Sequence, residues 1–111
     1  KRAYHPDTHV ADEALIARWE RAWRVARRAA DLLRARFAAT RVVTFGSLAH
    51  RAGFTAWSDV DLAVWGLASD AYYRAVAEVT GLSAEFEIDL VIPDDCHPGL
   101  RDVIEQEGIP L

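Results

Sequence analysis

The amino-acid sequence predicts one α/β domain of the α+β type, with a small mixed β-sheet, helices packed on one face and an acidic surface on the other. Three observations lead to this fold class. A long stretch has helical periodicity, three short segments are rich in β-branched and aromatic residues, and acidic residues recur at every second position of two of these segments. The 111 residues suffice for one hydrophobic core and are too few for two, so residues 1–111 are interpreted as a single domain.

The first half of the chain predicts a lead-in followed by a long amphipathic helix. Residues 1–11 are interpreted as poorly ordered, and His5 and His9 within them as incidental rather than as metal ligands. The helix is expected from Asp12, a suitable N-cap, with an arginine-rich outer side that is either a solvated face or a docking surface. Its apolar face is expected to comprise Leu15, Ile16, Trp19, Trp23, Ala26, Ala30, Leu33 and Phe37. The two tryptophans are either core residues or anchors for a protein partner.

After Thr40 the pattern changes to strands and shorter helices. The β-branched run 41–45 predicts a strand that ends at Gly46-Ser47. Further strands are expected at 59–65 and 85–92, the second closed by Pro93, and helices at 70–80 and 98–107, each followed by glycine. The expected order is therefore helix, strand, strand, helix, strand, helix.

Charge and composition exclude several classes of protein. Residues 1–51 hold 11 Lys+Arg and 5 Asp+Glu, whereas residues 52–111 hold 2 and 12, so the halves have opposite signs within a net charge of −4. This acidic total argues against general nucleic-acid binding, although the basic half suits a polyphosphate or an acidic partner. No apolar run approaches the roughly 20 residues of a membrane span, and no signal-peptide pattern opens the chain. A cytoplasmic protein is expected, and Cys96 stands alone without an intrachain disulfide partner.

Carboxylates alternate along the second and third expected strands. Asp59, Asp61 and Ala63 share one face by period two, and Glu85, Glu87 and Asp89 share one face of the third strand. If these strands are neighbours, Asp59, Asp61 and Asp89 converge and repel one another unless a divalent cation lies between them. Oxygen ligands of this kind suit Mg²⁺ or Mn²⁺. The alternative is an acidic face that is merely solvated, or paired with arginines of the first helix.

The Gly46-Ser47 pair could supply a phosphate-binding element. Gly46 would let the backbone approach a phosphate, Ser47 offers a hydroxyl and an N–H group, and the next residues could begin a short helix. Alone, a Gly-Ser dipeptide predicts only a turn. Its combination with Ser-Asp-x-Asp about a dozen residues later, and with one more strand-borne aspartate, is far more specific.

The stretch "GSLAHRAGFTAWSDVDLAV", residues 46–64, resembles the signature of the DNA polymerase β-type nucleotidyltransferases, and from about Arg41 to Leu111 the chain resembles their minimal members. The resemblance implies that Gly46 and Ser47 hold the β- and γ-phosphates of a nucleoside triphosphate. It also implies that Asp59 and Asp61 bind two Mg²⁺ ions, and that Asp89 completes one metal site and helps to deprotonate the attacking hydroxyl. Arg51 and Gly53 follow Gly-Ser later than in the common family pattern, which leaves a phosphate role for Arg51 open.

The resemblance also implies a function. A nucleotidyltransferase of this kind would transfer a nucleoside monophosphate, AMP from ATP being expected, to a hydroxyl group. The minimal members resemble antitoxins of toxin–antitoxin pairs, whose partner is a HEPN-type ribonuclease modified on a tyrosine. The competing interpretation is a binding module that neutralises its partner by occlusion with a vestigial metal site. Homo-oligomerisation is left open.

Overall fold

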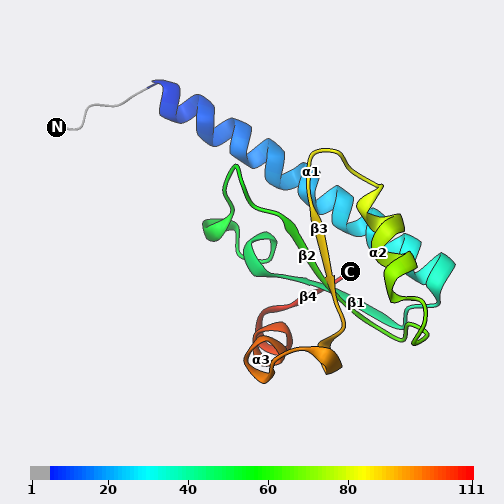
Figure 1. The fold of residues 1–111 in the computed structure, drawn as a ribbon. Helices are drawn as coiled ribbons and strands as arrows, with labels where there is room; N and C mark the ends of the chain where they lie inside the picture. Colours follow the sequence, from blue (N-terminus) through cyan, green and yellow to red (C-terminus); the bar gives the residue numbers. More distant parts are fainter. Residues whose placement is uncertain (1–5) are drawn as a thin grey trace.

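The computed structural model describes residues 6–111, with side chains from Glu13 onward, and confirms the predicted α+β fold class (Figure 1). Three helices surround a four-stranded mixed sheet. The elements in chain order are α1 Pro6–Phe37, β1 Arg41–Phe45, β2 Val60–Trp65, α2 Tyr72–Thr80, β3 Ile88–Val91, α3 Pro98–Glu107 and β4 Ile109–Pro110. Every predicted helix and strand is present, and β4 is an addition that the sequence did not predict.

The strand order in the sheet is β3-β2-β1-β4. β1 pairs antiparallel with β2 and with β4, and β2 pairs parallel with β3 through the crossover helix α2. β4 is two residues long and contains Pro110, which an edge strand tolerates because its outer N–H groups need no partner. Such a short segment has no pattern of its own, and only pairing with Val43 and Thr44 makes it a strand.

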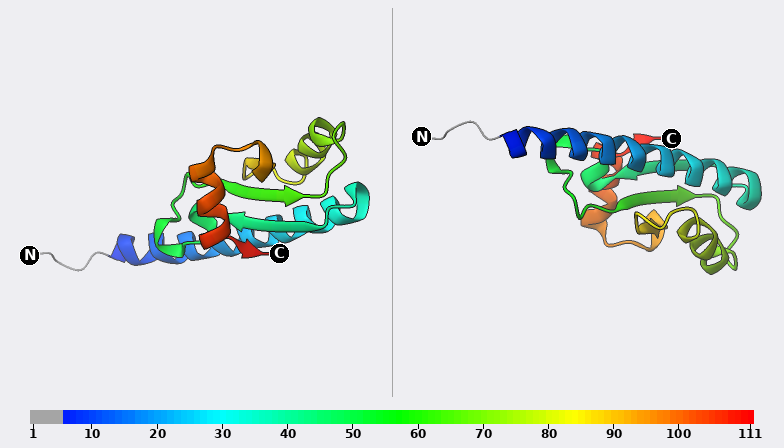
Figure 2. Two further views of the ribbon diagram at one scale, coloured as in Figure 1. Left: turned by 90° about the horizontal axis from the view of Figure 1, so that it is seen from below. Right: turned by 90° about the horizontal axis from the view of Figure 1, so that it is seen from above.

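Helix α1 begins at Pro6, so the expected N-cap at Asp12 is wrong. Proline is favoured in the first turn of a helix, where its missing N–H would have no intrahelical acceptor. The backbone of residues 6–11, which were expected to belong to the lead-in, is therefore part of the helix. The other lead-in residues, 1–5, include His5 and lie outside the described residues, as does the side chain of His9. Both views of Figure 2 show α1 running along the sheet, with its first turns extending past the strands. No described helix is long and apolar enough to cross a membrane.

The buried stripe of α1 consists mainly of small residues. Its fully buried positions are Ala22, Ala26, Ala29, Ala30 and Leu33. Alanine lets the helix backbone approach the sheet closely, so the wider Trp19 and Trp23 lie at the edge of the contact and are only partly buried. Ile16, predicted on the apolar face, is 38% exposed.

Helices cover both faces of the sheet, which corrects the expectation that all of them pack on one face. α1 and α2 pack on the face that carries Val60, Leu62 and Val64. α3 contributes Ile104 to a second cluster with Val43, Phe45 and Ala63 on the opposite face. In Figure 1, α1 and α3 lie on opposite sides of the strands. The aspartate-bearing face is therefore partly covered, because α3 packs on its β1 and β2 residues.

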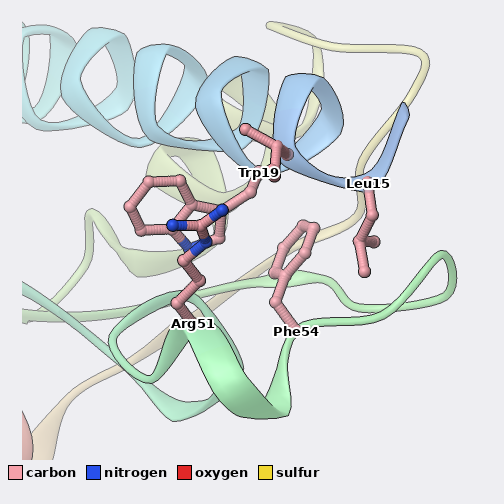
Figure 3. A pocket seen from close by; sticks show the side chains of 5 residues that line it. Leu15, Trp19, Arg51 and Phe54 are labelled. Carbon is pink, nitrogen blue, oxygen red and sulfur yellow. The ribbon is translucent and has the colours of Figure 1, made fainter. Parts of the chain in front are cut away.

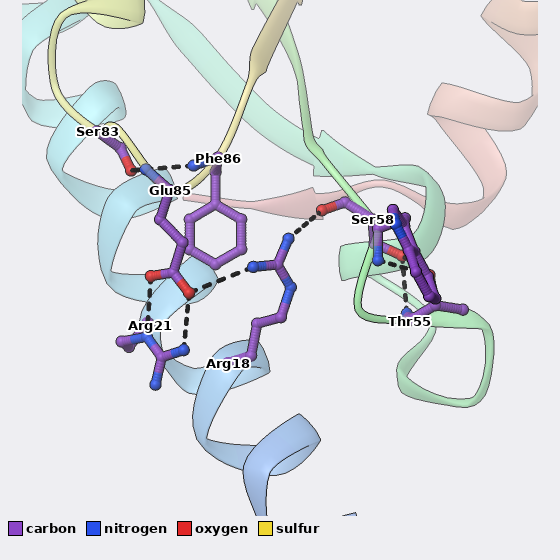
Figure 4. Close-up of polar contacts among 8 residues, drawn as sticks. Arg18, Arg21, Thr55, Ser58, Ser83, Glu85 and Phe86 are labelled. Carbon is purple, nitrogen blue, oxygen red and sulfur yellow. Dashed lines mark hydrogen bonds and ion pairs between the residues drawn. The ribbon is translucent and has the colours of Figure 1, made fainter. Parts of the chain in front are cut away.

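Strand β3 is shorter than predicted, and this moves Glu85 away from the acidic face. Regular pairing starts at Ile88, so the alternation that would place Glu85 beside Asp89 does not hold. Instead, Arg21 donates two hydrogen bonds to the Glu85 carboxylate, at 2.9 and 2.7 Å, and Arg18 a third at 3.2 Å (Figure 4). These arginines lower the pKa of Glu85. Pairing with arginines of the first helix, one of the alternatives given for the acidic face, is therefore what the structure shows for Glu85.

Candidate active site

Asp61 and Asp89 lie directly opposite each other on parallel neighbouring strands. The register pairs Asp61 of β2 with Asp89 of β3, so the two carboxyl groups lie on neighbouring strands at the same level of the sheet. The pKa of Asp61 is raised to about 6, first by burial, then by the negative charges of Asp89 and Asp59, and also by the hydrogen bond with Asp89. In this arrangement the Asp61 carboxyl holds its proton to a higher pH than an exposed aspartate does. The convergence predicted for this pair is therefore present.

Asp59 is less closely engaged than the other two aspartates. It lies just before β2, partly buried, and acts on Asp61 through its charge. Within residues 13–111, no group of three or more His, Cys, Asp or Glu side chains is arranged to hold a metal ion. The structure thus brings Asp61 and Asp89 together and leaves Asp59 at the margin of the pair.

Gly46 brings the Gly-Ser loop against this carboxylate pair. It follows the last residue of β1, Phe45, whose partner across the antiparallel ladder is Asp61. Gly46 has φ +72°, and a Cβ atom added there would lie 2.6 Å from Oδ2 of Asp61. Buried Thr44 holds the backbone of Asp61 in place, because its hydroxyl donates to the Asp61 carbonyl at 2.9 Å. A glycine is therefore required here both for the backbone conformation and for the close approach.

The loop from Gly46 to Asp59 is held by buried anchors at two points. Leu48 and Phe54 insert into the core on the α1 side, and the indole N–H of Trp19 donates to the Leu48 carbonyl at 3.3 Å. The short helix that the residues after Gly-Ser could begin is limited to two separate 3-10 turns, Gly46–Leu48 and Arg51–Gly53. Neither turn is long enough to build up a helix dipole.

Ser47 is the group of this loop available to a ligand. Its side chain is half-buried, and in the part of the chain that the structure describes its hydroxyl has no hydrogen-bond partner. A hydroxyl without a protein partner, on the residue directly after Gly46, is a ready donor to a phosphate oxygen. The geometry is therefore compatible with the phosphate role that the sequence predicts for Ser47.

The turn before Asp59 is ordered by its own side chains and by α1. The Thr55 N–H donates to the Ser58 hydroxyl at 2.8 Å, and Arg18 donates to the Ser58 carbonyl at 3.1 Å (Figure 4). Trp57 at the tip of this turn is 87% exposed. The turn is thus a fixed support that presents one indole ring to solvent, two residues from Asp59.

Arg51 points toward α1. Its guanidinium carbon lies 5.4 Å from the centre of the Trp19 ring, beside Phe54 (Figure 3). Its neighbour His50 contacts Glu107 of α3 at 2.7 Å. Arg51, which follows Gly-Ser later than in the common family pattern, therefore contacts Trp19 of α1.

Two of the three aspartates of this site, Asp61 and Asp89, are placed as a magnesium ion requires. Mg²⁺ is bound in many proteins by one or two carboxylates, with waters and substrate phosphates as its remaining ligands. Asp61 and Asp89 supply two close carboxylates. Burial, and after it the charges of Asp89 and Asp59, raise the pKa of Asp61, and a cation between the carboxylates would offset both effects. No ion pair joins Asp59, Asp61 or Asp89 to an arginine among the residues described.

Two residues that shape the site were not singled out in the sequence. Arg18 holds the turn before Asp59, and Thr44 holds Asp61. Trp19, expected on the apolar face of the helix, also holds the loop through its bond to Leu48. A signal for Arg18 was present, because it lies four residues before Ala22 and so continues the buried stripe of α1. No comparable signal marks Thr44, which reads as an ordinary strand residue.

The pKa of Asp61 predicts how the metal-free chain responds to pH. A carboxyl whose pKa is about 6 when folded and about 4 when unfolded binds more protons in the folded state between these values. The free energy of unfolding should therefore fall as pH rises from about 4 to 7, by roughly 1–2 kcal/mol after allowance for partial exposure. Asp61→Asn should remove this component, as urea denaturation in EDTA measures. Asp70→Asn, in the exposed loop before α2, is the control and should keep it. An unchanged pH profile in Asp61→Asn would contradict the raised pKa of Asp61.

Comparisons with known proteins identify similar structures. A protein proposed to be a minimal nucleotidyltransferase has a solved structure that is 31% identical, with a TM-score of 0.53; the match covers 89% of this chain and 94% of that one. A crystal structure of a toxin–antitoxin with AMP-PNP has a TM-score of 0.61 at 20% identity, over 77% of this chain and 70% of that one, and this likeness concerns the fold. No protein-family model and no curated protein matches the chain.

Proposed function

Because this chain belongs to the minimal nucleotidyltransferase family, we propose that it transfers AMP from ATP to a hydroxyl group of a protein partner in the cytoplasm. The observation that carries the proposal is the convergence of Gly46 with the Asp61–Asp89 pair at one end of the sheet. A close-approach glycine, a free serine hydroxyl and adjacent carboxylates are the parts that phosphoryl-group chemistry requires.

Each residue has a role in this proposal. Ser47 and the Gly46 backbone would hold the terminal phosphates of the nucleotide, and Asp61 and Asp89, with Asp59 beside them, would hold two Mg²⁺ ions. When bound, these ions neutralise phosphate charge that the carboxylates alone would repel. Asp89 accepts the proton of the attacking hydroxyl. The acceptor oxygen forms a bond to the α-phosphorus, the bond from that phosphorus to the bridging oxygen breaks, and pyrophosphate leaves.

The acceptor in this proposal is a tyrosine of a HEPN-type toxin, and the chain acts as its antitoxin. The similar fold of a toxin–antitoxin solved with AMP-PNP supports a nucleotide and a toxin as partners.

A second candidate function is neutralisation of the partner by occlusion alone. The marginal position of Asp59, and the absence of a three-residue metal cluster among the described side chains, favour this alternative. Nucleotide transfer requires the aspartates, whereas occlusion does not, so aspartate variants distinguish the two functions.

ATP binding should depend on a divalent cation. The triphosphate and the ionised aspartates repel each other at short range, and a cation between them turns this repulsion into attraction. We expect affinity for ATP to be at least about tenfold higher with Mg²⁺ than in EDTA, a difference of about 1.4 kcal/mol, by titration calorimetry. Equal affinity in EDTA would remove the metal site from the proposed function.

A further inference from the structure

A groove runs along one flank of α1, away from the aspartates. It consists of three adjoining cavities of about 270, 480 and 390 Å³. The first and second share Trp19, and the second and third share Trp23 and Arg27, so they form one continuous surface, which we call the α1 groove (Figure 3 shows its first part). From Leu15 to Asp31 it follows the helix for about 24 Å, at 1.5 Å per residue.

The floor of the α1 groove is aromatic and incompletely covered. Trp19 and Trp23 lie one helical turn apart with their rings edge to face, 6.0 Å between centres. Both are only partly buried, and Ile16 beside them is 38% exposed. The indole N–H of Trp23 has no hydrogen-bond partner in the described part of the chain. Large aromatic side chains in such a half-covered state are typical anchors of protein interfaces.

The rim of the α1 groove carries arginines that lack a carboxylate partner. Arg27 and Arg51 stack on the rings of Trp23 and Trp19, at 5.3 and 5.4 Å, and Arg24 lines the middle cavity. Among the described residues, none of these three forms an ion pair. By contrast, four arginines outside the groove are paired with glutamates: Arg18, Arg21, Arg36 and Arg41. Glu20 and Asp31 reduce the charge of the groove but leave it positive.

We propose that the α1 groove binds an acidic amphipathic helix of a partner protein. A helix of about 16 residues matches the 24 Å length, its apolar stripe would cover Trp19 and Trp23, and its carboxylates would pair with the rim arginines. A second copy fits less well. Its α1 carries the same positive charge, and its acidic α3 has 10 residues, which is too short to fill the groove. The inference concerns the docking surface only, so it stands or falls separately from nucleotide transfer.

The four tryptophans of the chain provide a direct test. The full chain, labelled with ¹⁵N, is titrated with a synthetic helical peptide of about 16 residues that has leucine along one stripe and glutamate elsewhere. We expect the indole N–H signals of Trp19 and Trp23 to shift, while those of Trp57 and Trp65 stay in place. Trp57 is the internal control, because at 87% exposure it would respond first to unspecific apolar binding.

Charge reversal tests the rim. Arg27→Glu should weaken peptide binding at least about tenfold, and Arg28→Glu, a matched change on the exposed back of α1 outside the groove, should leave it unchanged. Arg24→Glu replaces Arg27→Glu if that variant melts early. A peptide with lysine in place of glutamate should not bind.

Three outcomes would overturn the proposal. Equal binding of the lysine peptide would remove the charge complementarity. A shift of the Trp57 signal alone would place the contact elsewhere. Shifts of the Trp19 and Trp23 signals on concentrating the chain without peptide would make a second copy the occupant.

Discussion

Replacing Asp89 by Asn should lower nucleotide transfer by about 10²–10⁴-fold while the chain stays folded. Asn has nearly the size of Asp but cannot accept the proton of an attacking hydroxyl, and it supplies one negative charge less to a cation. Asp89 is exposed, so no packing is lost. The measurement is Mg²⁺-dependent transfer of label from α-labelled ATP to the partner, co-expressed with the chain. Glu87→Gln, an equally exposed carboxylate two residues earlier, is the matched control and should keep full activity.

Asp61→Asn should cause a comparable loss, and the double variant Asp61→Asn, Asp89→Asn should be scarcely worse than either single one. Residues that act as one metal-binding unit are not additive in their effects on the rate. The partner's activity in the cell is measured alongside the transfer. If the Asn variants silence the partner as fully as the unaltered chain does, occlusion is the function, even where transfer is measurable with purified proteins.

Replacing Gly46 by Ala should damage both the fold and the site. The positive φ of this residue costs a non-glycine residue about 1–2 kcal/mol. In addition, the new methyl group would lie 2.6 Å from the Asp61 carboxylate and force it to turn away. We expect a free energy of unfolding lower by at least that backbone cost, measured with urea, and ATP affinity lower by at least about tenfold, measured by calorimetry.

Gly53→Ala is the matched control for this change. Gly53 lies in the same loop, is exposed and would place its new methyl group in open space, so stability and ATP affinity should both be retained. Loss of stability in Gly46→Ala with unchanged ATP affinity would separate Gly46 from nucleotide binding and limit it to a structural role.

The sequence by itself determined the elements whose signal is local. The helical period of α1, the β-branched run before Gly46, and the alternation within 59–65 each depend on residues a few positions apart, and all three predictions are confirmed. The motif around Gly46, Asp59 and Asp61 also identified the family, which the comparison with a solved structure confirms. The roles of these residues in catalysis stay predictions.

Only the tertiary structure decided which of these parts meet. The parallel pairing of β2 with β3 places Asp61 opposite Asp89, and the antiparallel pairing of β1 with β2 brings Gly46 against Asp61. Packing also decided that alanines, not the tryptophans, form the centre of the α1 contact, and that Glu85 turns to the arginines of α1. Such contacts join residues far apart in the chain, and their free energy comes from burial and pairing that no local pattern records.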